Sequence, residues 1–151
     1  MAQRGRAAGV TLVLNPSPAQ PMPDELLRGL DYLVLNERAL HVLTEGTGDP
    51  TALLDRGVGS VVLTLGARGA CLVSRIGVGD VAPFRVSSVD STAAGDAFLG
   101  ALAATLPERG IDGALRAASA AGALATTRWG AQAALPTIEE VDAFLERGGA
   151  V

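Results

Sequence analysis

The segment Asp90-Ser-Thr-Ala-Ala-Gly-Asp96 joins two carboxylates to a turn of small residues and runs directly into the apolar stretch 97–104. This pattern predicts a helix that begins near Ala93 and carries Asp96 in its first turn. The first amide N–H groups of a helix lack internal partners and lie at the positive end of the helix dipole, so they attract anions. Small side chains would let a phosphate approach, and Asp96 would suit the role of base for a hydroxyl beside a phosphoryl group.

The same segment also has a purely structural interpretation. A Ser or Thr before a turn of small residues, followed by an Asp, caps an ordinary helix. The choice between an anion site and a plain helix cap therefore depends on the elements around the segment.

Short apolar runs alternate with helical segments before residue 66, which predicts an α/β fold. Strands are expected at 10–14, 32–35 and 60–65, and helices at 23–30, 37–43 and 50–56. Strands separated by helices pair in parallel, so their carboxyl ends meet at one edge of the sheet, where ligands of open α/β sheets bind. Asn15, Asn36 and Thr64 lie just after, or at the end of, these runs, and the polar motifs therefore converge on that edge.

A different pattern follows the third strand. The short alternating runs 70–74 and 79–86, separated by Gly77, predict an antiparallel hairpin at the sheet edge. Helices are expected at 93–106, 112–127 and 137–147, with Pro107, Gly110, Gly130 and Pro136 as breaks. In the second of these helices, residues at helical spacing form a closely packed face: Leu115, Ala118, Gly122 and Ala125. Residues 1–9 fit the end of a helix that precedes the first strand.

The composition excludes several classes of site. All 12 basic residues are Arg, so a phosphate-binding or Schiff-base lysine is absent, and the net charge of −4 argues against nucleic-acid and membrane partners. Cys71 and His41 are each alone, which excludes a disulfide framework and a Cys-based zinc site within one chain; we expect Cys71 in the core and His41 at a helix surface or boundary. The sequence has no leader pattern and no apolar run of about 18 residues, so a cytoplasmic location is expected.

Several stretches resemble the ribokinase family of sugar and nucleoside kinases, the phosphofructokinase B (pfkB) type. Residues 90–96 resemble the family's D-T-x-(G/A)-A-G-D motif, and further matches occur in the family's order at 12–19, 35–37, 63–70, 127–132 and 142–145. The resemblance covers nearly the whole chain and is closest to the ribokinases. It implies part of a three-layer αβα fold: a mainly parallel sheet with an edge hairpin and three C-terminal helices.

The resemblance also implies how the segment 90–96 would act. Asp96 would abstract the proton of the sugar hydroxyl that attacks the γ-phosphoryl group of ATP. The amides of Ala93, Ala94 and Gly95 would form the anion hole for that group. This division suits phosphoryl transfer, which depends on positioning and charge neutralisation more than on covalent catalysis.

The resemblance places further residues near ATP and Mg²⁺. The loop that lies against ATP is matched by Thr64, Gly66, Ala67, Arg68 and Gly69. A plain β-turn would need the same glycines. Asn36 matches a residue near the phosphates and the Mg²⁺ water shell, although a helix cap is an equal alternative, and Ser119 matches a position beside the adenine. Ala39 replaces the Glu of the family's Asn-x-x-Glu pattern, so the carboxylate that the family has near Mg²⁺ is absent here, although Glu37 is nearby.

A monovalent cation, usually K⁺, lies next to the anion hole in the family and is bound mostly by backbone carbonyl groups. The matching positions here are Asp90, Thr92, Ala125, Arg128, Gly130 and Ala134. Ribokinases usually have Ser at the position of Ala134, so weaker K⁺ coordination is expected. The alternative for Asp90 is a structural turn cap. We expect Trp129 to pack beside this loop.

By this resemblance, residues 1–151 form the C-terminal nucleotide-binding and catalytic part of a kinase domain, without the N-terminal sugar-binding half and lid. Two functions follow from it. The first is ATP-dependent phosphorylation of a sugar hydroxyl by a truncated or split chain, with a small sugar or nucleoside as the second substrate. The second is a non-catalytic nucleotide-binding or interaction module. In either case an exposed sheet edge favours association.

Overall fold

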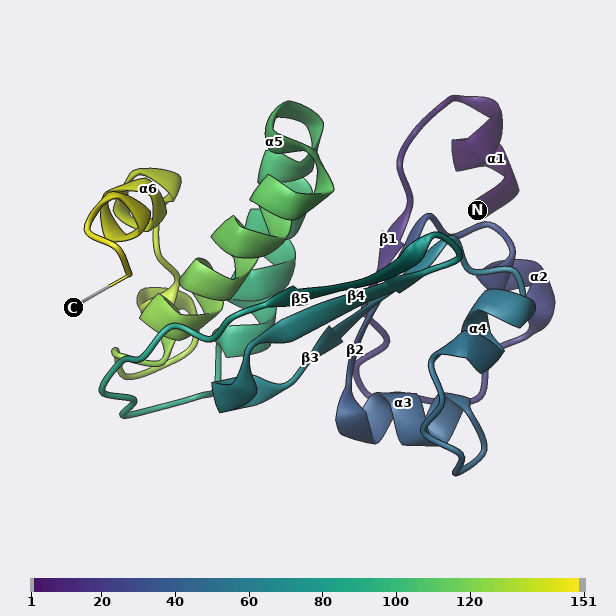
Figure 1. Cartoon of the computed structure of the whole chain (residues 1–151), viewed down its shortest axis with the longest axis horizontal. Helices are drawn as coiled ribbons and strands as arrows, with labels where there is room; N and C mark the ends of the chain where they lie inside the picture. The colour runs from purple at the N-terminus through teal and green to yellow at the C-terminus, as the bar shows by residue number, and fades with distance from the viewer. Residues whose placement is uncertain (1, 150–151) are drawn as a thin grey trace. The chain divides into compact units, whose positions relative to one another are not determined.

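The computed structural model describes residues 2–149, which divide into two compact units (Figure 1). The first unit contains the residues up to Gly66 and Ala70–Asp80, and the second contains Ala67–Gly69 and the residues from Val81 onward. Met1, Ala150 and Val151, which the sequence analysis included in the domain, lie outside the described residues.

The first unit is built on a mixed sheet with the strand order β1-β2-β3-β4-β5. The strands are β1 (Val13–Leu14), β2 (Tyr32–Asn36), β3 (Ser60–Thr64), β4 (Ala70–Ser74) and β5 (Gly77–Val81). β1, β2 and β3 pair in parallel, whereas β3 and β4 are antiparallel. The predicted parallel core with a hairpin at its edge is therefore confirmed.

Three helices cover the apolar positions of this sheet: α2 (Asp24–Leu27), α3 (Glu37–Leu43) and α4 (Thr51–Asp55). Leu33 and Leu35 of β2 and Val61 of β3 are at most 1% exposed and pack in one cluster with leucines of these helices. The alternate residues Val34 and Val62 are equally buried. Burial on both faces explains why these strands are continuous apolar runs in the sequence.

Arg56, which follows α4, joins the helices of the first unit. Its Nε donates to the Asp24 carboxylate at 2.8 Å, while its Nη1 and Nη2 donate to the carbonyl oxygens of Leu43 at 3.1 Å and Met22 at 2.6 Å. One guanidinium group thus satisfies acceptors on α2, at the end of α3 and before α2.

Several predicted boundaries of the first unit differ from the structure. The predicted helix end at residues 1–9 is confirmed by α1 (Ala2–Ala7), but β1 is only two residues long, and Val10 is 55% exposed rather than part of a strand. The second strand of the hairpin was predicted at 79–86, whereas β5 spans Gly77–Val81. Pro83 has no amide hydrogen to donate, so the ladder does not continue through it. The Ser17–Pro18 peptide bond is cis.

The second unit consists of α5 (Ala94–Ala125), the 3₁₀ turn η2 (Gln132–Ala134) and α6 (Ile138–Glu146). Two separate helices were predicted within α5, with Pro107 and Gly110 as breaks. The break at Gly110 is confirmed, since its φ of 65° and ψ of −179° are not helical, whereas the helix continues through Pro107. Proline removes one helical hydrogen bond, whereas Gly110 adopts a backbone conformation that reverses the chain. The three predicted helices are therefore the two arms of α5 together with α6.

Small residues hold the two arms of α5 close together. Ala97 of the first arm packs with Ala120, Ala121 and Leu124 of the second arm, and Phe144 of α6 completes this cluster. The predicted closely packed face is confirmed, since its largest member, Leu115, is 2% exposed and Ala118 is fully buried.

Side chains at the rim of the second unit add polar and aromatic contacts. Arg109 pairs with both carboxylate oxygens of Asp142 at 2.6 and 2.9 Å, which joins α5 to α6. The Phe84 ring lies 5.2 Å from that of Phe144, and the guanidinium of Arg116 lies 5.6 Å from the centroid of Phe84. These contacts fix α6 on the arms of α5. No helix within residues 2–149 has the length and apolar character needed to cross a membrane.

Candidate functional site

In the first unit, Asn36 and Thr64 lie side by side at the carboxyl ends of β2 and β3, where they are register partners. The predicted convergence of these two residues on one sheet edge is confirmed. Asn36 Oδ1 accepts a hydrogen bond from the Ala39 amide at 2.8 Å and so caps α3. Thr64 Oγ1 donates to the Leu35 carbonyl at 3.2 Å. The cap interpretation of Asn36 is therefore correct, and its side-chain oxygen already has one partner.

The turn that follows β3 is the 3₁₀ helix η1 (Gly66–Arg68), and Ala67 and Arg68 are exposed in it. Gly69 ends the turn with a φ of +91°, and a β-carbon at this position would lie 2.1 Å from the carbonyl oxygen of Val81. The chain itself therefore requires glycine at position 69. A β-carbon on Gly66, in contrast, would meet nothing within 4 Å, so the backbone of this residue is open to a ligand.

In the second unit, α5 begins without a side-chain cap. Ala93 occupies the cap position, and the Ala94 amide donates to the Ser91 carbonyl at 3.2 Å. Within the described residues, the amides of Ala93, Gly95 and Asp96 have no hydrogen-bond acceptor. The alternative in which the hydroxyl groups of Ser91 or Thr92 cap the helix is not what the structure shows, and its first amides remain available.

Gly95 and Asp96 are the open part of this first turn, whereas Ala93 is 3% exposed. A β-carbon on Gly95 would meet no atom within 4 Å, and Asp96 is exposed in the same turn. Asp96 also borders a cavity of about 220 Å³ between the first arm of α5 and residues 135–141, whose other lining is mainly apolar. A carboxylate and unpartnered amides thus share one accessible helix start.

The Asp90 carboxylate connects the segment before α5 to the segment after it. One oxygen accepts from the Thr92 amide at 3.0 Å and from the Thr92 hydroxyl, and the other accepts from the Gly130 amide at 3.0 Å. The Thr92 hydroxyl, followed by the Gly130 amide, lowers the pKa of Asp90. The predicted turn cap at Asp90 is therefore present, and it extends to a residue 40 positions away.

The Thr126 carbonyl holds the same two segments together, a contact that no local sequence pattern predicts. It accepts hydrogen bonds from the amides of Val89 and Asp90 at 2.7 and 3.1 Å. The structure thus brings the 89–92 and 126–130 segments into contact, which the predicted cation site requires.

The positions predicted for the monovalent cation lie on these connected segments. Ala125 ends α5, and its carbonyl accepts from the Arg128 amide at 3.3 Å. The carbonyls of Thr92, Arg128 and Gly130 accept no hydrogen bond from the described residues. Ala134 is fully buried in η2 and supplies no side-chain oxygen. Within residues 2–149, no three His, Cys, Asp or Glu side chains gather to hold a metal, so any cation here would depend on carbonyl oxygens.

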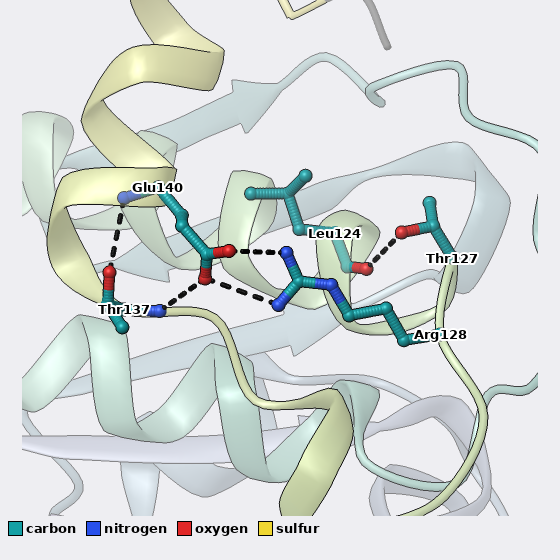
Figure 2. A network of polar contacts seen from close by, with 5 residues as sticks. All are labelled: Leu124, Thr127, Arg128, Thr137 and Glu140. Atoms are coloured by element: carbon teal, nitrogen blue, oxygen red, sulfur yellow. Dashed lines mark hydrogen bonds and ion pairs between the residues drawn. The ribbon is translucent and has the colours of Figure 1, made fainter.

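A polar network that the sequence analysis missed lies next to this loop (Figure 2). Arg128 and Glu140 form two parallel contacts of 2.6 and 3.2 Å. Glu140 Oε2 also accepts from the Thr137 amide at 2.9 Å, and the Glu140 amide donates to Thr137 Oγ1 at 3.3 Å, which completes a capping box at the start of α6. The Thr-x-x-Glu spacing could have predicted the capping box, but nothing local in the sequence pairs it with Arg128.

Four further residues had a predicted environment or role. The Ser119 hydroxyl is buried and has no hydrogen-bond partner within the described residues. Cys71 is in the core, where burial raises the pKa of its thiol, and His41 is exposed at the end of α3, as predicted. The prediction that Trp129 packs beside its loop is wrong, because 76% of this residue is exposed. Its neighbour Arg128 makes the contact with α6 instead.

Comparisons with known proteins give one consistent answer. Residues 1–138 match the family described as pfkB family carbohydrate kinase. A ribokinase of Haemophilus influenzae is 41% identical over 155 residues, which cover 96% of this chain and 50% of that protein. The crystal structure of a ribokinase from Thermotoga maritima superposes with a TM-score of 0.88 at 35% identity and covers 96% of this chain and 51% of that one.

A third match was solved with ligands. The ribokinase of Arabidopsis thaliana in complex with ribose and ATP has a TM-score of 0.86 at 26% identity, covering 96% of this chain and 50% of that one. These similarities identify the fold as part of a ribokinase-like α/β fold. The chain spans about half the length of the relatives it matches.

Proposed function

This chain belongs to the pfkB family of carbohydrate kinases, and we propose that it carries the part of such a kinase that binds ATP and transfers its terminal phosphoryl group to a sugar hydroxyl. The observation that carries the proposal is the start of α5, where amides without acceptors, open space and the Asp96 carboxylate occur together. Helix starts of this kind bind phosphate groups.

The amides at the start of α5 would form the anion hole. The Ala94 amide already donates to Ser91, so the amides of Ala93 and Gly95, joined by that of Asp96, are best placed to receive phosphoryl oxygens. Donors that are fixed before the reaction stabilise the charge that develops in the transition state without having to reorganise.

Asp96 would act as the general base. Its carboxylate would accept the proton of the sugar hydroxyl while that oxygen attacks the γ-phosphorus and ADP leaves. Proton transfer of this kind contributes roughly 10²- to 10⁴-fold to the rate. Asp96 is exposed in the first turn of α5, which supports this role, because the hydroxyl group of a bound sugar must be able to reach the carboxylate.

Each unit, taken by itself, has features that support contacts with a nucleotide. The adjacency of Asn36 and Thr64 and the open backbone at Gly66 support phosphate contacts in the first unit, and Ala67, Arg68 and Gly69 would continue that loop. The buried, unpartnered hydroxyl of Ser119 supports a contact with the adenine, since such a group is costly to leave unsatisfied. The ATP complex of the Arabidopsis ribokinase agrees with a nucleotide ligand.

The two cations of the proposal differ in how well the residues fit them. For Mg²⁺ the fit is poor, because Ala39 has no carboxylate and Asn36 Oδ1 is already a cap, so no step is assigned to it. For K⁺ the fit is better, because the carbonyls of Thr92, Arg128 and Gly130 are unengaged and lie on segments joined by Asp90. Bound K⁺ would supply positive charge beside the anion hole.

The length of the chain leaves a second candidate function. Because the chain spans half of its relatives, a non-catalytic nucleotide-binding module is the alternative to a catalytic part of a truncated or split kinase. A small sugar or nucleoside would be phosphorylated only together with the other half of the relatives' length, which this chain does not match. That half would add to the edge of β1, which ends the strand order.

An assay of ATP consumption against pentoses, hexoses and nucleosides separates the two functions. It should be run with the 151-residue chain alone and with any encoded chain that carries the N-terminal half. The kinase proposal expects turnover with one class of sugar in the completed assembly. Calorimetry in the presence of Mg²⁺ and K⁺ should show weak ATP binding to the chain alone, and an absence of ATP binding would contradict both candidates.

A further inference from the structure

We propose that Glu140 is a positioning residue for the cation loop, defined as residues 126–134, and that it acts by holding the Arg128 side chain on α6. This inference rests on the proposed function, because the cation loop would bind K⁺ beside the anion hole. Neither Glu140 nor its partner Thr137 belongs to the predicted site.

The contact between Arg128 and Glu140 restricts the loop at its centre. Two parallel hydrogen bonds, at 2.6 and 3.2 Å, join the planar guanidinium to the carboxylate, and Figure 2 shows the two groups facing each other. Such a fork fixes orientation as well as distance. The carbonyl of Arg128, a predicted cation ligand, is attached to the residue whose side chain is fixed in this way.

Glu140 is itself held in place. Its Oε2 accepts from the Thr137 amide at 2.9 Å, and its own amide donates to Thr137 Oγ1. The next residue, Val141, and Phe144 are buried, which anchors α6 to the arms of α5. The carboxylate is therefore presented by a fixed helix start.

Other hydrogen bonds hold the cation loop on either side of Arg128. Near its beginning, Thr127 Oγ1 donates to the Leu124 carbonyl at 2.7 Å, and the Thr126 carbonyl accepts from two amides of the 89–90 segment. Beyond Arg128, the Gly130 amide donates to the Asp90 carboxylate. Loss of Glu140 would free the Arg128 side chain between these points while leaving both of them intact.

The chain offers a closely matched control. Arg109 and Asp142 form another two-pronged ion pair between α5 and α6, with distances of 2.6 and 2.9 Å. The two carboxylate side chains are equally accessible, since Asp142 is 42% exposed and Glu140 is 43% exposed. Asp142 is two residues from Glu140, but its partner Arg109 ends the first arm of α5, next to Gly110. Removing this pair weakens the packing of α6 without touching the cation loop.

Trp129 provides the readout. It is the chain's only tryptophan, lies between Arg128 and Gly130, and is 76% exposed, so its fluorescence reports on the loop and does not depend on turnover. The 151-residue chain would be titrated with KCl at constant ionic strength, with choline chloride as the balancing salt and NaCl as the comparison. Circular dichroism would confirm that each variant is folded.

The expected result is a K⁺-specific change in Trp129 emission whose midpoint rises about tenfold in Glu140→Gln, a typical effect of removing a group that orients a metal ligand. Asp142→Asn should leave the midpoint within about twofold, because it removes no group that orients a ligand. Arg128→Lys, which keeps the charge but loses the fork, should behave like Glu140→Gln and replaces it if that variant does not fold.

Equal midpoints in Glu140→Gln and the unaltered chain would overturn the inference, as would equal shifts in Glu140→Gln and Asp142→Asn. A chain that binds ATP but gives no K⁺-specific signal would overturn the inference and leave the proposed function standing. A chain with the Glu140-dependent K⁺ response but no ATP binding would contradict the proposed function and leave this inference standing.

Discussion

Gly122 lies against Ala94, so that a β-carbon on Gly122 would be 3.2 Å from the Ala94 carbonyl oxygen. The second arm of α5 thus supports the first turn of the same helix, where the anion hole is proposed. Because this contact is with backbone, a larger side chain at position 122 must displace the helix start.

The first prediction follows from that contact. Gly122→Val should lower the free energy of unfolding by about 1 to 3 kcal/mol, the usual cost of overpacking, and should also weaken ATP binding. Urea unfolding and calorimetry would measure the two effects. Gly100→Val is the control on the first arm, since a β-carbon there meets nothing within 4 Å, and equal losses in both variants would contradict the explanation.

Gly95→Ala separates ligand binding from folding. A β-carbon at this position meets no atom of the protein, and alanine favours helix over glycine by up to about 1 kcal/mol, so stability should be unchanged or slightly higher. The added methyl group would occupy the space proposed for a phosphate, and ATP affinity should fall at least severalfold. Unchanged affinity in calorimetry would place the phosphate elsewhere.

Asp96→Asn tests the proposed base. In an assembly competent for turnover, the substitution should reduce phosphoryl transfer by about 10²-fold or more, because the amide cannot accept the hydroxyl proton. ATP affinity and thermal stability should remain near those of the unaltered protein, since the Asp96 side chain makes no hydrogen bond within the described residues. Retained turnover would remove Asp96 from this role.

Asp142 predicts a pH dependence of stability. The Arg109 guanidinium lowers the pKa of Asp142 in the folded protein, so the pair stabilises the fold fully above the unfolded pKa of about 3.9. That contribution is lost as the pH falls through the lowered folded pKa. The difference in unfolding free energy between the unaltered chain and Asp142→Asn should be constant from about pH 7 to pH 5 and shrink below about pH 4. A difference that grows on acidification would contradict this sign.

The sequence predicted what depends on local pattern. β2 and β3 were recognised because strands buried on both faces must be apolar throughout, and the helix at 94 was recognised from its small-residue turn. The contacts of Arg56 and Arg128 were not predictable. The local sequence around an arginine is the same whether its side chain binds a residue far along the chain or is hydrated by solvent. Trp129 was misjudged for the same reason, because its exposure depends on the path of a loop fixed by Asp90 and Glu140.

The position of α6 in the chain has a consequence for synthesis. Its two carboxylates pair with Arg109 and Arg128, which lie on either side of the second arm of α5, yet α6 follows both arginines in the sequence. On the ribosome, both arms must emerge before either ion pair can close. We therefore expect the second unit to complete its folding only when its last helix has left the exit tunnel, and the arms to be most exposed to proteases until then.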